Sequence, residues 1–204
     1  MKLYYAPFAC SLAVHIALRE AGLPFDLEAV DLRSKKTSSG ADYLGINPKG
    51  YVPALQIEPG VLLTEAHALL QYVADQRPET NLAPRNGTLE RYRLQEMLAY
   101  VGTEIHKAFS PLWNPQIAPE ARAASVAAIT RRLGLLEEIL GRQSFLLGTT
   151  FSVADAYLFT VLNWAPILKF DLSAFPAIGA FVQRVGARPA VQAALGAESA
   201  ASGK

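Results

Sequence analysis

The start of the chain has a strand–helix–strand order, and this order restricts the fold more than any other feature. Residues 2–5 are short, aromatic and β-prone, and residues 12–20 contain good helix formers with one apolar face. Gly22 and Pro24 follow as helix stop signals. The alternating residues 25–29 then predict a second strand. A helix that crosses between two strands predicts a parallel pair in a right-handed α/β unit.

The only cysteine, Cys10, stands at the expected N-terminus of that first helix. Free N–H groups of a first helical turn favour negative charge, so a thiol there should ionise more readily than a free cysteine. The alternative is a small buried apolar side chain. A lone cysteine also excludes an internal disulfide, which fits a reducing compartment, and we expect a cytoplasmic protein.

A second pair of strands is expected after a mobile, charged connection. Residues 51–57 and 61–63 flank a Glu-Pro-Gly turn and predict an antiparallel hairpin. If the Val52–Pro53 bond were cis, the backbone groups of Val52 could pair with an extended peptide. An ordinary trans turn is the alternative.

Two charged positions in this half have two interpretations each. Thr64 is expected to cap a helix with Glu65 in its first turn. Glu65 then either stabilises the helix dipole or accepts from a ligand's ammonium group. The charges from Arg33 to Lys36 are either a solvated face or contain one lysine that meets a ligand's carboxylate.

The second half shows only helical patterns. Two prolines and a glycine among residues 77–87 indicate a linker, placed at residues 79–87, and long helices are expected over 88–109 and 119–140. Ser152 and Asp155 have the spacing of a capping box before an apolar helix, so Asp155 is expected to be structural. His106 and Lys107 lie near the end of the first long helix. There they either complement its dipole or, for His106, face a ligand beside small residues.

These elements predict an α/β plus all-α protein. Residues 1–78 would form a thioredoxin-like domain of order βαβ–ββα, residues 79–87 a linker, and residues 88–204 an all-helical domain. The net charge of +1 gives no reason to expect nucleic acid or an anionic membrane as partner. No apolar run reaches the roughly 18 residues of a membrane span.

The chain resembles the glutathione transferases, and within them the bacterial beta class, over nearly its whole length. Cys10 together with His106 and Lys107 points to the beta class. The matching stretches are Met1-Lys2-Leu3-Tyr4-Tyr5, Cys10-Ser11-Leu12, Asn47-Pro48-Lys49-Gly50-Tyr51-Val52-Pro53-Ala54-Leu55, Leu62-Leu63-Thr64-Glu65, Thr103-Glu104-Ile105-His106-Lys107 and Ser152-Val153-Ala154-Asp155-Ala156-Tyr157-Leu158.

The resemblance implies a homodimer that conjugates glutathione, used as a co-substrate, to small hydrophobic electrophiles in detoxification. It implies no tightly bound cofactor and no metal. Catalytic roles fall to Cys10 and His106, and contacts with the electrophile to Phe109, Trp113 and Trp164. Contacts with glutathione fall to Lys35, Val52, Pro53 (cis), Glu65, Ala66, Thr103, Glu104 and Lys107.

Two positions depart from the family pattern. Ala66 stands where the family commonly has Ser, and Ala99 where it often has Asn. One lost hydrogen bond to a charged group is worth about 1.5–3 kcal/mol, so glutathione binding could be weaker. Two alternatives stay open: a glutathione-dependent thiol–disulfide oxidoreductase or peroxidase that uses Cys10 as nucleophile, and a non-catalytic binding protein for apolar ligands.

Overall fold

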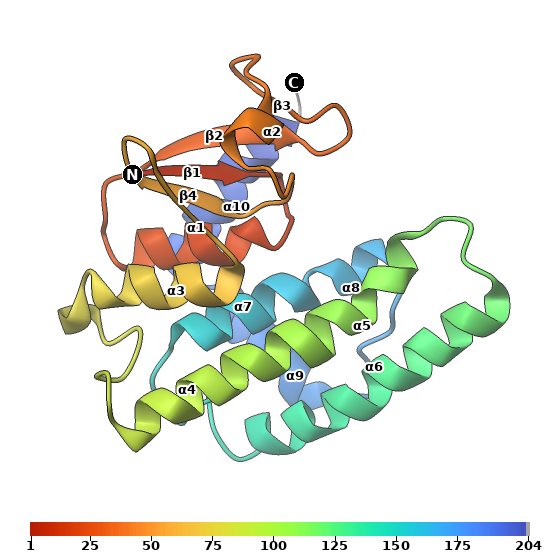
Figure 1. Ribbon diagram of the computed structural model, residues 1–204. Helices are drawn as coiled ribbons and strands as arrows, with labels where there is room; N and C mark the ends of the chain where they lie inside the picture. The colour runs from red at the N-terminus through yellow and green to blue at the C-terminus, as the bar shows by residue number, and fades with distance from the viewer. Residues whose placement is uncertain (203–204) are drawn as a thin grey trace. The chain divides into compact units, whose positions relative to one another are not determined.

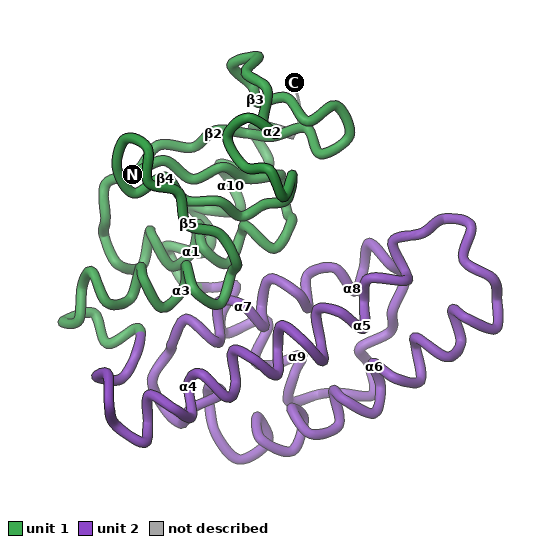
Figure 2. Tube along the Cα trace, viewed as in Figure 1, with its two compact units in different colours: residues 1–82, 188–204 green, residues 83–187 purple. Residues whose placement is uncertain are grey.

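The computed structural model describes residues 1–202, and the chain divides into two compact units. The first unit contains residues 1–82 together with the C-terminal stretch from residue 188, and the second contains residues 83–187 (Figure 2). The first unit is therefore built from both ends of the chain.

A mixed five-stranded sheet of order β3-β2-β1-β4-β5 forms the centre of the first unit. Its strands are β1 (Lys2–Tyr5), β2 (Asp26–Asp31), β3 (Lys36–Thr37), β4 (Ala54–Glu58) and β5 (Val61–Thr64). The β1 and β2 strands are parallel, whereas β4 is antiparallel to both β1 and β5. The expected strand–helix–strand unit and hairpin are both confirmed, and the thioredoxin-like prediction with them. The two-residue strand β3 was not anticipated.

Helices cover both faces of this sheet. The helical elements of this unit are α1 (Ser11–Glu20), α2 (Tyr43–Ile46), α3 (Ala66–Asp75), the 3-10 turn η1 (Pro78–Thr80) and α10 (Pro189–Ser202). Figure 1 shows α1 and α3 on one side of the strands and the short α2 on the other. On the α2 side, Tyr43 is fully buried and packs with Tyr4, Val30 and Val52. Successive residues of β1 thus contribute to two apolar layers, as the period of a strand requires.

The C-terminal helix α10 packs against α1 in the first unit. The sequence had suggested that it belonged with the other helices. A buried carboxylate explains its placement. Glu198 Oε1 lies 2.9 Å from His15 Nδ1, and Glu198 Oε2 accepts from the Phe8 N–H at 2.6 Å. Local periodicity carries no information about a contact between residues so far apart in the chain.

The second unit is all helical. Its elements are α4 (Leu89–Tyr100), the π-helical segment η2 (Val101–His106), α5 (Lys107–Phe109), the 3-10 turn η3 (Ser110–Trp113), α6 (Pro119–Leu140), α7 (Val153–Leu162), α8 (Trp164–Ile167) and α9 (Pro176–Gly186). The helix expected over 88–109 is thus a helical run with a π-helical insertion. The capping box at Ser152 and Asp155 is confirmed, and every residue of α7 is buried.

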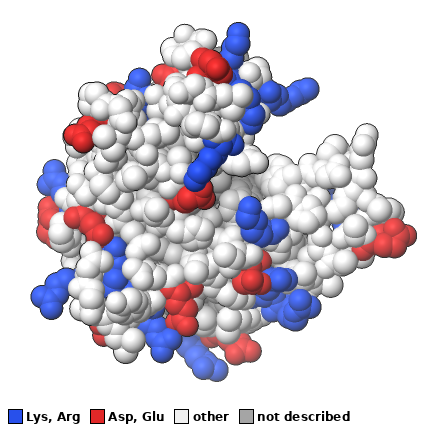
Figure 3. Space-filling model, viewed as in Figure 1, with Lys and Arg blue, Asp and Glu red and all other residues white. Residues whose placement is uncertain are grey.

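Charged side chains of both signs are interspersed on the face of the molecule seen in Figure 3, as the net charge of +1 suggests. Among residues 1–202, none of the helices combines the length and the apolar composition that crossing a membrane requires.

Candidate active site

Cys10 occupies the N-cap position of α1, as the sequence predicted. Two residues earlier, Phe8 has a φ of 59°, which turns the chain sharply between β1 and α1. Cys10 is partly exposed, and its thiol donates to the Val52 carbonyl, with Sγ 3.2 Å from the oxygen. The thiol is therefore placed against the backbone of the segment expected to bind an extended peptide.

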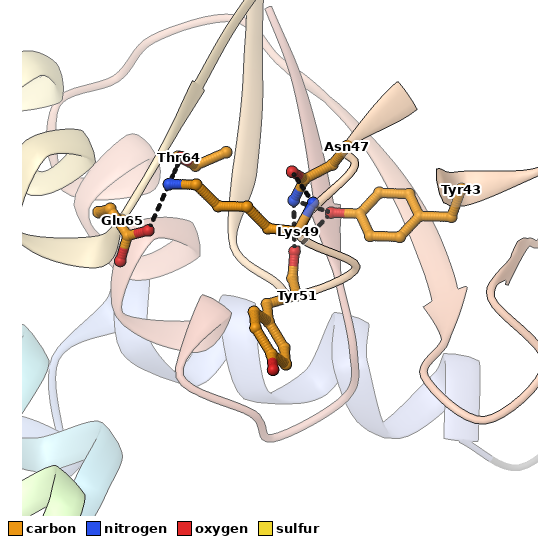
Figure 4. Close-up of polar contacts among 6 residues, drawn as sticks. All are labelled: Tyr43, Asn47, Lys49, Tyr51, Thr64 and Glu65. Carbon is orange, nitrogen blue, oxygen red and sulfur yellow. Dashed lines mark hydrogen bonds and ion pairs between the residues drawn. The ribbon is translucent and has the colours of Figure 1, made fainter. Parts of the chain in front are cut away.

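The Val52–Pro53 peptide bond is cis. The preceding residue, Tyr51, is held through its carbonyl, which accepts from the Tyr43 hydroxyl at 2.7 Å and from the Asn47 amide at 2.8 Å (Figure 4). These two contacts tie the segment to α2. Tyr43 was not singled out from the sequence, and Asn47 appeared there only as part of a stretch that matches the family, with no role of its own.

Glu65 has a strained backbone at the start of α3. Its φ of 72° and ψ of 116° place it in a region that L-residues rarely adopt, at the N-cap position. Its carbonyl accepts from the N–H groups of Ala68 and Leu69. The sequence prediction was wrong by one residue here. Thr64 ends β5 and does not cap the helix, because Glu65 makes the turn and Ala66 begins α3.

The Glu65 carboxylate projects from this turn toward Lys49. Lys49 Nζ lies 2.6 Å from Glu65 Oε1 and 3.0 Å from Thr64 Oγ1 (Figure 4). Both side chains of the ion pair are more than half exposed. A strained, non-glycine residue that presents an exposed carboxylate is typical of a functional position. Lys49 was missed by the sequence analysis.

Lys35 also has a positive φ, of 56°. Its Nζ donates to the Gly50 carbonyl at 2.9 Å and lies 5.9 Å from the centre of the Tyr51 ring. The structure thus places Lys35 beside the Val52 segment, in the same unit as Cys10 and Glu65.

In the second unit, His106 ends the π-helical segment. Its Nδ1 lies 2.8 Å from the hydroxyl of buried Tyr157, and its ring contacts Trp164 edge-on, with centroids 4.8 Å apart. These contacts fix the orientation of the imidazole. A π-helical insertion is frequent at functional sites, because it changes which side chains a helix presents.

The neighbours of His106 in sequence have different surroundings. Thr103 is exposed and donates to the Ala99 carbonyl at 2.9 Å. Glu104 accepts from Arg132, with Oε2 2.7 Å from Nε. Lys107 is exposed. The contact with Arg132 gives Glu104 a structural partner within its own unit.

The three aromatic residues expected to contact an electrophile do form one cluster. The Trp164 ring contacts Trp113 at 5.7 Å and Phe109 at 6.4 Å between centroids. Phe109 is fully buried and Trp164 nearly so, whereas Trp113 is 48% exposed. The expected direct contact of Phe109 with a ligand does not fit its burial. Phe109 instead packs against Trp164, which in turn contacts the exposed Trp113.

Two family models match the chain. Residues 9–76 match the glutathione S-transferase N-terminal domain, and residues 100–189 match the glutathione S-transferase C-terminal domain. Glutathione S-transferase GstA of Escherichia coli O157:H7 is 46% identical, over 97% of this chain and 98% of that protein.

Solved structures agree with this. A sphingomonad glutathione S-transferase complexed with glutathione is 47% identical, with a TM-score of 0.94 over 98% of this chain and 99% of that one. A bacterial beta-class glutathione S-transferase from Sphingomonas chungbukensis is 50% identical, with a TM-score of 0.93 over 97% and 98% of the two chains.

Proposed function

The chain belongs to the glutathione S-transferase family. From this we propose a role for each site residue in the conjugation of glutathione to an apolar electrophile. The enzyme transfers groups to the sulfur of glutathione, which serves as co-substrate. The finer assignment concerns three parts: a peptide site in the first unit, a thiol at α1, and an aromatic wall in the second unit.

The observation that carries the peptide site is the strained Glu65 at the start of α3. Its exposed carboxylate binds the ammonium of the γ-glutamyl group, and the Ala66 N–H at the helix start meets the carboxylate of that group. The backbone of Val52 pairs with the cysteinyl residue as an added strand does. Lys35, beside Gly50 and Tyr51, binds the glycyl carboxylate.

The chemistry then depends on the sulfur of glutathione. Held near Cys10 at the N-terminus of α1, the glutathione thiol loses its proton more readily, because the helix dipole favours the anion. The thiolate forms a carbon–sulfur bond with the electrophile, and the leaving group departs with its electron pair. Cys10 serves this step by polar contact with the sulfur, and the family resemblance assigns the same role to His106. The resemblance likewise assigns polar contacts with glutathione to Thr103, Glu104 and Lys107.

The electrophile is held by apolar contact with Trp113. Trp113 is the exposed member of the aromatic cluster, Trp164 packs against its ring, and Phe109 packs against Trp164. Edge-to-face aromatic pairs of this kind are worth about 0.5–1.5 kcal/mol beyond their buried area. The site accordingly favours flat, apolar electrophiles over charged ones.

Calorimetry of glutathione binding, combined with conjugation of a chloronitrobenzene, tests this function. We expect saturable binding and turnover in the wild type. Glu65→Gln should weaken binding more than tenfold, because a hydrogen bond to a charged group contributes about 1.5–3 kcal/mol. Glu58→Gln, at an exposed position of β4, is the matched control and should bind as the wild type does. Equal binding by Glu65→Gln and wild type would contradict the peptide site.

Cys10→Ala separates conjugation from thiol–disulfide exchange. If glutathione is the nucleophile, conjugation persists in this variant. If Cys10 attacks a disulfide itself, disulfide reduction disappears while glutathione binding persists. Cys10 is partly exposed, so thiol–disulfide exchange is the second activity to measure.

A homodimer in the cytoplasm completes the proposal. Exposed aromatic and aliphatic side chains support a partner surface: Tyr51 in the first unit, and Leu89 and Tyr92, three residues apart on α4, in the second. Sedimentation should give twice the 22.1 kDa mass of one chain. A single cysteine and a glutathione substrate both fit a reducing compartment.

A further inference from the structure

Lys49 is fixed at its backbone by the turn that precedes Val52. Its N–H donates to the Asn47 side-chain oxygen at 3.2 Å, and the Gly50 N–H donates to the Asn47 carbonyl at 2.9 Å. Asn47 is itself bonded to the Tyr51 carbonyl. The base of the Lys49 side chain is therefore anchored to the same segment that carries the proposed peptide site.

The Lys49 ammonium lies against the carboxylate that the proposed function assigns to the ligand (Figure 4). A carboxylate has about four lone-pair sites, so Glu65 can accept from Lys49 and from a ligand's ammonium at once. The pair presents a positive and a negative group 2.6 Å apart, both more than half exposed. This arrangement is complementary to the ammonium and carboxylate that one carbon atom carries in an α-amino acid.

The γ-glutamyl end of glutathione is an α-amino acid group of this kind. Glu65 alone can bind only its ammonium and not its carboxylate. Ala66 has no hydroxyl with which to bind the carboxylate, so its backbone N–H is the one contact assigned there so far. Lys35 is directed to the Gly50 carbonyl and is assigned to the glycyl end. A cation for the γ-glutamyl carboxylate is available in Lys49.

We propose that Lys49 is a specificity-determining residue, which binds the α-carboxylate of the γ-glutamyl group while Glu65 binds its ammonium. This inference rests on the proposed function. It extends the site by one residue and states why an α-amino acid end is preferred over a simple amine.

The test compares glutathione with 4-aminobutyryl-cysteinylglycine, which is glutathione without its α-carboxylate. Calorimetry gives the preference of each protein for glutathione, expressed as the ratio of the two dissociation constants. We expect Lys49→Met to reduce this preference about two- to fivefold, the range that exposed ion pairs usually support. The reduction should become smaller at high salt, because exposed charges are screened.

Two variants control for charge. Lys49→Arg keeps a cation and should retain most of the preference. Lys36→Met removes the same charge from an exposed position on β3 and should leave the preference unchanged. Lys49 is exposed, so thermal unfolding of Lys49→Met should match that of the wild type.

A preference that is unchanged or increased in Lys49→Met overturns the inference, and so does a wild type that binds both peptides equally. These results leave glutathione binding and conjugation intact, because the wild type still binds glutathione, although equal binding would also remove the contact assigned to the Ala66 N–H. A wild type that binds neither peptide overturns the proposed function, and the inference falls with it.

Discussion

If glutathione binds as proposed, single substitutions at the start of α3 should change how tightly its amino-acid end is held. Ala66 occupies the first position of the helix, is nearly buried, and lacks the hydroxyl common at this position in the family that the chain resembles. Ala66→Ser should therefore tighten glutathione binding by roughly 1.5 kcal/mol, about tenfold, because a hydroxyl would donate to a charged carboxylate. Calorimetry measures this. Ala68→Ser, at an exposed position of the same helix, should have no effect.

Asp155 is the residue for which the pH dependence of stability has a definite sign. Burial raises the pKa of its carboxyl from 3.8 to about 6, against the opposing effect of hydrogen bonds from Leu146 and Ser152. Between these two values the folded state binds more protons than the unfolded state. The contribution of Asp155 to stability is therefore complete below pH 3.8 and is lost as the pH rises through about 6.

Urea unfolding of the wild type and Asp155→Asn at pH 7 and pH 5 tests this sign. The free energy of unfolding of the wild type relative to Asp155→Asn should increase by about 1 kcal/mol at the lower pH. Asp171→Asn is the control. Hydrogen bonds from Ser173 lower the pKa of the Asp171 carboxyl below 3.8, so its difference from wild type should not change over this range. A difference for Asp155→Asn that shrinks toward pH 5 would contradict the assignment.

At the scale of elements, α10 is joined to α1 by a buried chain of hydrogen bonds. Arg19 Nε donates to His15 Nε2 at 2.8 Å. Because a guanidinium only donates, His15 Nε2 accepts, and the Nδ1–H then donates to Glu198. Both His15 and Glu198 are completely buried. Glu198 also holds the Phe8 N–H, which connects α10 to the loop that leads to Cys10.

Glu198→Ala should therefore be costly. The substitution removes a buried carboxylate that accepts from the His15 Nδ1–H and from the Phe8 N–H, and a hydrogen bond to a charged group is worth about 1.5–3 kcal/mol. Urea unfolding should show a loss of this order, whereas Glu96→Ala, which breaks an exposed pair with Arg93, should cost less than about 1 kcal/mol. A loss below 1 kcal/mol for Glu198→Ala would mean that α10 is held by apolar packing alone.

The elements could be predicted from sequence where the signal is local. The alternation of β2, the stop signals after α1, and the Ser152–Asp155 spacing each specify one element through neighbouring residues. The motif residues Cys10 and Glu65 could be found in the same way. The start of α3 was misplaced because Glu65 adopts a positive φ that its residue type does not favour.

Features without a local sequence pattern could not be predicted. The π-helical segment η2 replaces what periodicity describes as continuous α-helix. Lys49 contacts Glu65 across 16 positions of sequence, and no local pattern predicts this pairing. The burial of Phe109 was likewise missed, because the sequence around an aromatic residue next to a proline-broken segment does not show whether the residue is buried.

At the scale of the whole molecule, the first unit depends on a helix that lies at the other end of the sequence. Every residue of α1 from Ser11 to Leu18 is buried, so this helix needs cover on all sides. The cover includes α3 and α10, which both contact it. The unit that holds Cys10 and Glu65 is therefore completed only when residues 188–202 are in place.

Truncation after Ala187 tests this dependence. It removes α10, exposes one side of α1, and leaves His15 and the Phe8 N–H without the Glu198 carboxylate. Exposure of apolar surface costs about 25 cal/mol per Å², so we expect the first unit to lose its cooperative unfolding and its glutathione binding. The second unit, residues 83–187, keeps its own core, so helical circular dichroism should fall without disappearing. Adding a peptide of residues 188–204 should restore part of the binding. A truncated chain that binds glutathione as tightly as the full chain would show that α1 is stable without α10.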